Sequence, residues 1–483
     1  MRVSLNGGAY QSGSLIASSQ RCVNLYAENI PQAEGEPSRT THYQTPGLRP
    51  LHVLSNGAPV RGLYTASNGD LYAVAGSSVY YLTPTYRETV VGTLTTVAGP
   101  VSMTDNTLTL VIVDGSVRGA NPTTYDGGMQ VDLSTRVASP MPTATAGFYG
   151  SDLVWYLGTF LVFNKPKTPQ FYVSGSLAVT FDPLDFANKS SAADYLVAAI
   201  PARGQLLLIG KETSEVWTLS GASDFAFQQL QGAVIEHGCM AVHSVAKSDG
   251  AVFFLSIDRQ GRSIVLKAAG YSATRISTHA IENAIAGYAD ASASRGYCRQ
   301  ERGHIFYVLT FPEATWVFDE ATNLWHQWVS FGADGAEHRH RGDCFTYAYD
   351  TAIVGDYQTG ALYALDTATF TDNGLPIRRI RSFPHMIDDA ERLSYKRFVA
   401  DIEVATGPDA EPASLMQLRY SDDRGATYGH PVFQTMGLLG QTYTSVQFRR
   451  LGLARDRVFE VSWTSASKVS LNGAFIDVEK SIS

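Results

Sequence analysis

The sequence predicts a mainly β protein, built as a β-propeller with an N-terminal extended arm and a C-terminal β-sandwich domain. A pair of strand-like segments recurs every 40–50 residues or so through the middle of the chain, which is a spacing typical of propeller repeats. A second, alternating strand pattern fills the last hundred residues or so. The composition agrees, because only 17% of residues are charged and 43 are glycine, so turns are abundant and long charged helices are missing.

Each repeat unit has an apolar or alternating strand, a Gly, Asp or Asn turn, and a second strand that is often rich in Tyr or Trp. The segments that form the seven units are 69–76 with 78–82, 108–113 with 114–115, 154–163 with 170–173, 206–210 with 215–219, 252–255 with 264–266, 304–309 with 315–319, and 352–356 with 360–365. Since one blade cannot bury both faces of its sheet, we expect neighbouring blades to stack around a ring. We interpret continuous apolar runs such as 206–209 as inner strands. The ring has six or seven blades, depending on whether the weak second and seventh units are complete.

The domain boundaries follow from changes in this pattern. Residues 1–50 have no repeat character and include the loop Pro31–Ser38, which is rich in Glu, Gly and Pro, so we expect an extended arm there. Residues 51–385 form the predicted propeller. Residues 386–483 form the predicted sandwich, with five or six strands in which buried and polar positions alternate. The buried positions are Phe398, Ala400, Ile402, Val404, Met416, Leu418, Tyr420, Val446, Phe448, Phe459, Val461 and Trp463.

One helix interrupts the strand pattern. Ser277 and Thr278 can cap its first turn. Ile281, Ile285 and Tyr288 then fall on one face at helical spacing. We expect this helix to be an insertion that packs on the ring.

The charge and cysteine content exclude several classes of protein. A net charge of −8 disfavours a protein that grips DNA phosphates, although it fits a surface that DNA passes without sticking, and simple solubility explains it equally well. The four cysteines are scattered without a C-x-x-C pair, which indicates buried free thiols in a reducing compartment. Residues 1–10 carry no signal-peptide pattern, and no apolar run approaches the ~20 residues of a membrane span.

The most specific local motif is the Asp-box pattern at 421–428. Its defining residues are Ser421, Asp423, Gly425, Thr427 and Tyr428. The carboxylate can accept hydrogen bonds from turn amides, and the glycine permits a positive φ, so we interpret the motif as a structural hairpin. The alternative is a sialidase-like glycosidase, which would also need an arginine cluster and a tyrosine nucleophile. The Arg-Ile-Pro sequence typical of sialidases does not occur in this chain.

The segment His338–Cys344 is the only dense group of histidines. His338 and His340, together with Asp343 or Cys344, could ligate a metal. Arg339 and Arg341 would repel a cation, however, and we interpret the segment as an exposed loop. Phosphate-loop, zinc-protease and nucleophile-elbow motifs are also missing from the sequence. We therefore expect no catalytic, cofactor-binding or metal-binding residues.

The clearest basic run is Arg378, Arg379 and Arg381. On a strand, Arg379 and Arg381 would share one face, where they could contact a partner chain or channel DNA. A solvated edge strand protected by charge is an equally good interpretation.

Segments in a fixed order along most of the chain carry a family resemblance. They are 24–26, 45–48, 61–64, 209–217, 221–222, Gly238 ahead of 241–244, 277–285 and 316–319. In these segments the chain resembles the packaged-DNA stabilisation proteins of short-tailed bacteriophages, also called tail accessory, hub or nozzle proteins. No pattern known to us covers the first ten residues or the segment His338–Cys344.

The resemblance implies a structural virion protein without catalytic residues. Such proteins are β-propellers that assemble as homohexamers below the portal and its head-to-tail adaptor, in a tail built in the host bacterial cytoplasm. They extend the channel, help to retain packaged DNA, touch DNA transiently during ejection, and hold a needle, plug, spike or fibre. Two alternatives stay open from the sequence: a virion-borne glycan hydrolase, suggested by the Asp box, and a glycan-binding protein, suggested by the 25 tyrosines.

Overall fold

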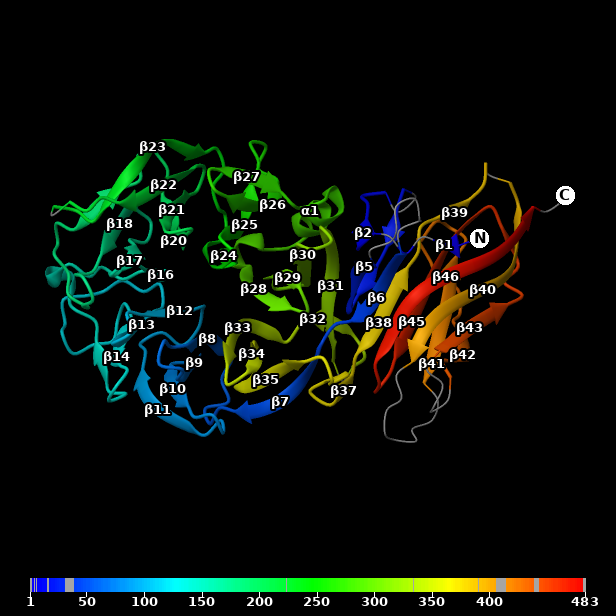
Figure 1. Ribbon diagram of the computed structural model, residues 1–483, viewed down its shortest axis with the longest axis horizontal. Coiled ribbons are helices and arrows are strands. Elements are labelled where there is room, and N and C mark those ends of the chain that lie inside the picture. Colours follow the sequence, from blue (N-terminus) through cyan, green and yellow to red (C-terminus); the bar gives the residue numbers. More distant parts are fainter. Residues whose placement is uncertain are drawn as a thin grey trace.

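The structure is a computed structural model that describes residues 2–3, 5, 7–14, 17–30, 39–222, 224–332, 334–389, 391–404, 414–437 and 443–480. The loop predicted at Pro31–Ser38 lies outside these residues. Figure 1 shows two lobes side by side, a ring of sheets and a second lobe of long strands that contains the C-terminus. The chain is mainly β, as predicted.

The ring has seven blades among the described residues, which answers the question of six or seven blades. Five blades are separate four-stranded sheets, and blades six and seven are four-stranded parts of larger sheets. Blade one contains β8 (Val60–Thr65), β9 (Leu71–Ala75), β10 (Ser78–Leu82) and β11 (Glu88–Thr93), and blade two contains β12 (Ser102–Asp105), β13 (Thr109–Val113), β14 (Met129–Asp132) and β15 (Ala138–Pro140). Blade three contains β16 (Val154–Leu157), β17 (Phe160–Asn164), β18 (Gln170–Val173) and β19 (Phe186–Asn188). Blade four contains β20 (Leu196–Ala202), β21 (Gln205–Gly210), β22 (Ser214–Leu219) and β23 (Phe227–Ile235). Blade five contains β24 (Ala246–Ser248), β25 (Ala251–Ile257), β26 (Ser263–Ala269) and β27 (Ser272–Arg275). Blade six contains β28 (Arg295–Glu301), β29 (His304–Thr310), β30 (Thr315–Asp319) and β31 (Leu324–Phe331). Blade seven contains β33 (Gly342–Ala348), β34 (Thr351–Asp356), β35 (Ala361–Asp366) and β7 (Gly47–Val53).

The continuous apolar runs are the second strands of their blades, which corrects our interpretation of 206–209 as an inner strand. Leu206–Ile209 belongs to β21, whereas the first strands, such as β8, β12 and β16, contact one another around the axis. A second strand has a partner on each side in its own sheet and a neighbouring blade over each face, so all of its positions are buried. The first strands border the axial space, where side chains such as Arg61, Trp155 and Arg295 lie.

The N-terminal region closes the ring. Strand β7 pairs antiparallel with β35, from Gly47 opposite Asp366 to Val53 opposite Ala361, and so becomes the outer strand of blade seven. In Figure 1 it runs along the lower edge of the ring from the boundary between the two lobes. The first and last parts of the propeller are therefore held together by backbone hydrogen bonds.

The second lobe is a β-sandwich, as predicted. One sheet has the order β43 (Tyr443–Arg449), β40 (Leu393–Val404), β46 (Val469–Lys480), β6 (Arg39–Gln44) and β5 (Leu25–Ile30), with β1 (Arg2–Val3) beside β46 and β44 (Leu453–Ala454) beside β40. The other contains β4 (Cys22–Val23), β38 (Arg378–Ser382), β45 (Asp456–Thr464), β41 (Leu415–Ser421) and β42 (Val432–Thr435), with β39 (Met386–Ile387) beside β45. The sheets share an apolar core that includes Phe398, Phe448, Phe459, Val461 and Leu471.

The two lobes share one sheet. Strand β4 pairs in parallel with β31 of blade six and antiparallel with β38 of the sandwich, so blade six continues into an 11-stranded sheet among the described residues. Within residues 1–50, where an extended arm is predicted, β4 to β6 pair with strands of blade six and of the sandwich, and Cys22 and Leu25 lie in the sandwich core. Strand β38 also pairs with the sandwich, although it lies inside the range 51–385. The division into 1–50, 51–385 and 386–483 stays a prediction.

The predicted helix is α1 (His279–Ala286), and its predicted cap and face are confirmed. The Thr278 hydroxyl accepts a hydrogen bond from the amide of Ile281, at 3.4 Å, and Ile281 and Ile285 are buried. The helix packs against β26 of blade five and against β2 (Tyr10–Gln11), which pairs with β3 (Ser19–Gln20). The remaining short elements are β32 (Glu337–Arg339), β36 (Thr371–Asp372), β37 (Leu375–Pro376) and the 3-10 turns at Ala144–Ala146, Val242–Ser244 and Ala291–Ala293.

Candidate functional site

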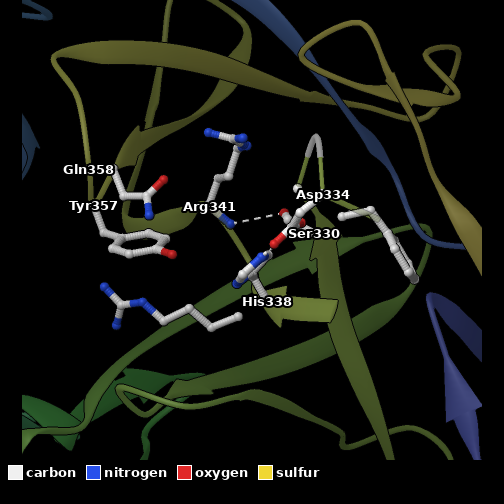
Figure 2. A pocket seen from close by; sticks show the side chains of 9 residues that line it. Ser330, Asp334, His338, Arg341, Tyr357 and Gln358 are labelled. Carbon is white, nitrogen blue, oxygen red and sulfur yellow. Dashed lines mark hydrogen bonds and ion pairs between the residues drawn. The ribbon is translucent and has the colours of Figure 1, made fainter. Parts of the chain in front are cut away.

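A basic pocket lies between the outer edge of blade six and the β34–β35 turn of blade seven. Its volume is about 360 Å³. Figure 2 shows side chains from both blades around it, and the polar groups among its lining residues are Ser330, Asp334, His338, Arg339, Arg341, Tyr357 and Gln358. Side chains 20–30 residues apart in the sequence meet here because the two blades stack side by side.

The segment His338–Cys344 forms one wall of this pocket, and our interpretation of it as an exposed loop is wrong. Strand β32 pairs with the end of β31, with Val329 opposite Arg339. His340 is only 6% exposed; its ring lies 4.9 Å from that of Trp328, and its Nδ1 accepts a hydrogen bond from the Gly342 amide at 3.1 Å. Burial lowers the pKa of His340 to about 4, so this imidazole is neutral near pH 7.

The guanidinium of Arg339 is fixed on three sides. Its Cζ lies 3.7 Å from the centre of the Tyr357 ring. One Nη1–H group donates to the Phe311 carbonyl at 3.3 Å and lies 3.4 Å from the buried Asp343 carboxylate. Stacking on an aromatic ring suits the planar guanidinium and restricts its motion.

The guanidinium of Arg341 is held by carboxylates behind the pocket wall. Its Nη1 lies 3.3 Å from Oδ2 of Asp356, which is fully buried and also accepts from the Tyr363 hydroxyl at 2.9 Å. Burial lowers the pKa of Arg341, but Asp372 and Asp356 outweigh that effect and raise it. The Ser330 hydroxyl donates to Asp372, and burial raises the pKa of this carboxyl to about 6.

Two arginine side chains, Arg339 and Arg341, line the pocket. His338 is exposed, with its Nε2 3.4 Å from Oδ1 of the exposed Asp334. Within the described ranges, no group of three or more His, Cys, Asp or Glu side chains is arranged to hold a metal ion. His338 and His340 in particular point into different surroundings, one to solvent and one to Trp328.

A second pocket, of about 230 Å³, lies on the propeller axis. Its polar lining includes Arg61, Trp155, His243, Arg295, Tyr297 and Asp343. Arg61 is 3% exposed and donates to the carbonyls of Gly76, Thr96, Ala98 and Gly99 at 2.6–2.9 Å. Arg295 forms a 2.7 Å ion pair with Asp343. The charged groups on the axis are thus used in holding blades together.

The Asp-box residues close the connection between the paired strands β41 and β42. Asp423 accepts from the Ser421 hydroxyl at 2.6 Å and from the amide and hydroxyl of Thr427 at 2.8 and 2.5 Å. These bonds lower the pKa of Asp423 to about 2. Gly425 has a φ of +92° and donates its amide to Ser421, and the guanidinium of Arg419 lies 4.6 Å from the Tyr428 ring. The groups of the motif that form these hydrogen bonds are therefore used to stabilise the turn.

The basic run on β38 is buried, which corrects both interpretations offered for Arg379 and Arg381. The strand lies between β4 and β45, so it is not an edge, and both side chains have 0% exposure. Arg379 donates to the carbonyls of Ile377 and Ser465, and Arg381 donates to those of Leu5, Gly8 and Arg21 at 3.3–3.4 Å. They cannot touch DNA or a partner in this fold. Arg378 is half-buried, and its contact with a partner or DNA stays a prediction.

Sequence reasoning missed Tyr357 and Gln358. They follow the seventh repeat unit, in the turn after Asp356, and nothing in their local pattern distinguishes them from other turn residues. Their role arises only from the stacking of blade seven on blade six.

Searches with family models identify both lobes. Residues 1–370 match the model described as the β-propeller of bacteriophage P22 Gp10, and residues 379–479 match the model of its β-sandwich. No curated protein matches this chain. No helix among the described residues has the length and apolar character needed to cross a membrane.

Solved structures add only distant likenesses. A streptogramin B lyase is 10% identical, with a TM-score of 0.40 over 71% of this chain and 97% of the lyase. Virginiamycin B lyase from Staphylococcus aureus is 8% identical, with a TM-score of 0.41 over 66% and 98%. The Pan2 WD40 domain of Neurospora crassa is 7% identical, with a TM-score of 0.40 over 67% and 95%. At such scores these likenesses carry no argument about this chain.

The two family models together cover nearly the whole sequence, in the order propeller then sandwich that the strand pairing also has. The chain belongs to the bacteriophage P22 Gp10 family, the tail accessory and DNA-stabilisation proteins of short-tailed phages, and is a structural protein of the virion tail.

Proposed function

We propose that this protein forms the nozzle, or hub, of a short-tailed phage tail, as a homohexamer that extends the channel of the portal and its adaptor. In this role it helps to retain packaged DNA and conducts it during ejection. The observation that carries the proposal is the shared sheet, which joins blade six to the sandwich and makes each subunit one stiff two-lobed body.

The stiffness comes from several independent bonds across the boundary of the lobes. Asn24 is 2% exposed; its amide donates to the carbonyls of Val329 in blade six and Arg378 in the sandwich, and its Oδ1 accepts from the Val329 amide, all at 2.9 Å. Backbone and side chain thus both bridge the lobes. A wall that must resist the pressure of packaged DNA needs subunits whose lobes do not hinge.

The path of DNA in this proposal lies between subunits and not along a propeller axis. The axial pocket, at about 230 Å³, is smaller than an ordinary small-molecule site of ~300–1,000 Å³. The Arg295–Asp343 ion pair and the buried Arg61 cross it. A duplex therefore needs a wider opening, which a ring of several copies supplies.

The charge of the chain supports a conduit that releases DNA. With a net charge of −8, each copy repels the phosphate backbone overall, and this favours sliding over binding. The partners in the proposal are the portal and adaptor at one end and a needle, plug, spike or fibre at the other. Assembly takes place in the host cytoplasm, where the four free cysteines stay reduced.

The proposal is tested by mass photometry and negative-stain electron microscopy of the purified protein, alone and mixed with the phage's portal–adaptor complex. We expect a six-fold ring whose mass is six times that of the 52.4 kDa chain, formed alone or on the adaptor. A chain that stays monomeric and binds no portal or adaptor protein would contradict the proposal.

A further inference from the structure

We propose that the pocket between blades six and seven is a binding site for an oxyanion group, a carboxylate or a phosphate. The site is made by Arg339 and Arg341 together with Tyr357 and Gln358, all of which line the pocket. Figure 2 shows Arg341, Tyr357 and Gln358 around it. Neither the conduit role nor the six-fold ring depends on this site.

The first argument is that the two arginines have unused hydrogen-bonding capacity. A guanidinium carries five N–H donors. In the described part of the chain, the Nε–H groups of Arg339 and Arg341 are buried without an acceptor. Buried donors are rarely left unsatisfied, and each such case calls for an ion, a water or a ligand.

The second argument is the length of the existing ion pairs. Arg339 lies 3.4 Å from Asp343 and Arg341 lies 3.3 Å from Asp356, whereas a charge-assisted N–H···O bond is normally about 2.7–2.9 Å long. The carboxylates behind the wall thus balance the charge of the arginines, but they are too far away to accept short hydrogen bonds from all of the guanidinium N–H groups. An oxyanion entering from the pocket can supply the missing acceptors.

The third argument is a contrast with the axial pocket. There, Arg61 donates to four carbonyls at 2.6–2.9 Å and Arg295 forms a 2.7 Å ion pair, so the guanidiniums already have acceptors at normal distances. The pocket at the rim is also larger, at about 360 Å³ against about 230 Å³. In the described residues, unpartnered Nε–H groups also occur on Arg299, Arg379 and Arg381, which line neither pocket. What distinguishes Arg339 and Arg341 is that they line the pocket at the rim.

The side chains of the lining set the class of ligand. Arg339 and Arg341 contribute two fixed positive charges, and Asp334, whose side chain is 61% exposed, is the one carboxylate among the lining residues. Since Asp343 and Asp356 lie behind the wall, the guanidinium donors on the pocket side, and not a net charge, favour an oxyanion over a cation or a neutral sugar. The stacking of Arg339 on Tyr357 and its bond to Phe311 fix the guanidinium before binding, which lowers the entropy cost of capturing a planar or tetrahedral oxyanion.

The experiment is isothermal titration calorimetry of the full chain with inorganic phosphate and, separately, with acetate, in sodium chloride at constant ionic strength. We expect saturable binding of one anion per chain with a dissociation constant below about 10 mM for at least one of them. Tighter binding of phosphate would identify a phosphoryl group as the natural ligand. Tighter binding of acetate would identify an acidic side chain of a protein partner.

Variants connect the binding to the pocket. Arg341→Gln should weaken binding about tenfold or more, because a charge-assisted bond is lost. Since it also leaves Asp356 without its cation, Arg341→Lys is the second variant: it keeps the charge but loses the fork, and should weaken binding about fivefold. Tyr357→Phe keeps the stacking and removes only the hydroxyl, so it should cause about a twofold loss.

The matched control is Arg259→Gln, which removes one positive charge from an exposed pair between the β25–β26 connection of blade five and Glu236. Its affinity should equal that of the wild type. The proposal is overturned if neither anion binds saturably, or if Arg341→Lys and Tyr357→Phe, both folded by circular dichroism, bind the tighter anion as well as Arg259→Gln does.

Discussion

The blades and the boundary between the lobes bury different chemistry. Between blades one and two, Leu110 and Ile112 pack against Tyr72 and Val74 in a core of apolar side chains. At the boundary, by contrast, Arg379, Arg381, His42 and His326 are buried at 0–3% exposure. Apolar cores fill the space between blades, where the Arg295–Asp343 pair adds an ionic contact. The boundary combines an apolar core with buried, directed hydrogen bonds that specify one arrangement of the lobes.

Two buried histidines at the boundary, His42 and His326, have lowered pKa values. His42 has no hydrogen-bond partner at either ring nitrogen among the described residues, and burial followed by the nearby Arg381 and His326 holds its pKa well below the usual value. Burial likewise lowers the pKa of His326 to about 4. At the boundary the neighbouring cation is Arg381, and His340 between blades six and seven is likewise buried with a lowered pKa.

The largest expected effect is at Asn24. Replacing it by Ala removes three buried hydrogen bonds between the lobes and forces Ala into the positive φ of 54°, which should destabilise the protein by about 4 kcal/mol. Urea unfolding followed by tryptophan fluorescence measures this loss. Asn24→Gly keeps the backbone conformation and loses the same bonds, so it should recover only about 1 kcal/mol of the loss. A loss below about 1 kcal/mol in Asn24→Ala would mean that the lobes do not depend on this bridge.

The next effect is in a blade core. Leu110→Ala should cost about 3 kcal/mol, because the side chain is fully buried and a cavity remains. In contrast to Asn24→Ala, it should leave the boundary intact, so limited proteolysis of the native protein should cleave the N-terminal strands no faster than in the wild type. Faster cleavage there would show that blades and boundary unfold together.

A smaller effect is expected from acid. Because the pKa of His326 is about 4 in the folded state and about 6.5 in the unfolded state, the unfolded state binds more protons between these values. The stability from keeping His326 neutral is therefore complete above pH 6.5, falls as the pH is lowered towards 4, and should be reduced by about 2 kcal/mol at pH 5. His42 adds a loss of the same sign.

Thermal unfolding from pH 7 to pH 5 tests this dependence, with His326→Gln as the comparison. The variant should show a flatter pH profile than the wild type. His304 works in the opposite direction, because its hydrogen bond to Asp319 raises its pKa, so its contribution is complete at low pH and declines as the pH rises. If the wild type and His326→Gln showed the same dependence of stability on pH, His326 would not be the cause of the loss in acid.

The smallest effect is at the cap of α1. Thr278→Ala should cost about 0.5 kcal/mol, at the low end for a lost cap, because the 3.4 Å bond to the Ile281 amide is long. The melting temperature measures it, and Thr278→Ser, which keeps the hydroxyl, should restore it. A loss as large as that of Leu110→Ala would make the helix a main part of the core.

Much of the fold was predictable because strands and their turns are local. Runs such as Leu206–Ile209 and the alternation at Phe398, Ala400 and Ile402 report burial directly, and the cap and apolar face of α1 follow from helical spacing. The place of a strand within a blade was not predictable, because burial on both faces does not distinguish a second strand from an inner one.

The errors at Arg379, Arg381 and His340 have one physical cause. A polar residue in a strand is interpreted as exposed unless something covers it, and the local pattern does not show the cover. The covering groups are β4 and the N-terminal carbonyls over β38, and Trp328 of the neighbouring strand over His340. The pocket was hidden for the same reason, since Tyr357 meets Arg339 only when the two blades stack.

The sequence by itself determined that this chain forms repeated sheets followed by a sandwich, since hydrophobic periodicity acts over a few residues and is written into each strand. Only the tertiary structure decided that the N-terminal strands join the two lobes, that arginines lie inside the joint, and that a basic pocket opens between two blades. Those features depend on contacts between residues that are not neighbours in sequence, hundreds of positions apart at the joint and fewer than thirty in the pocket. The chemistry of such a contact cannot be read from either partner alone.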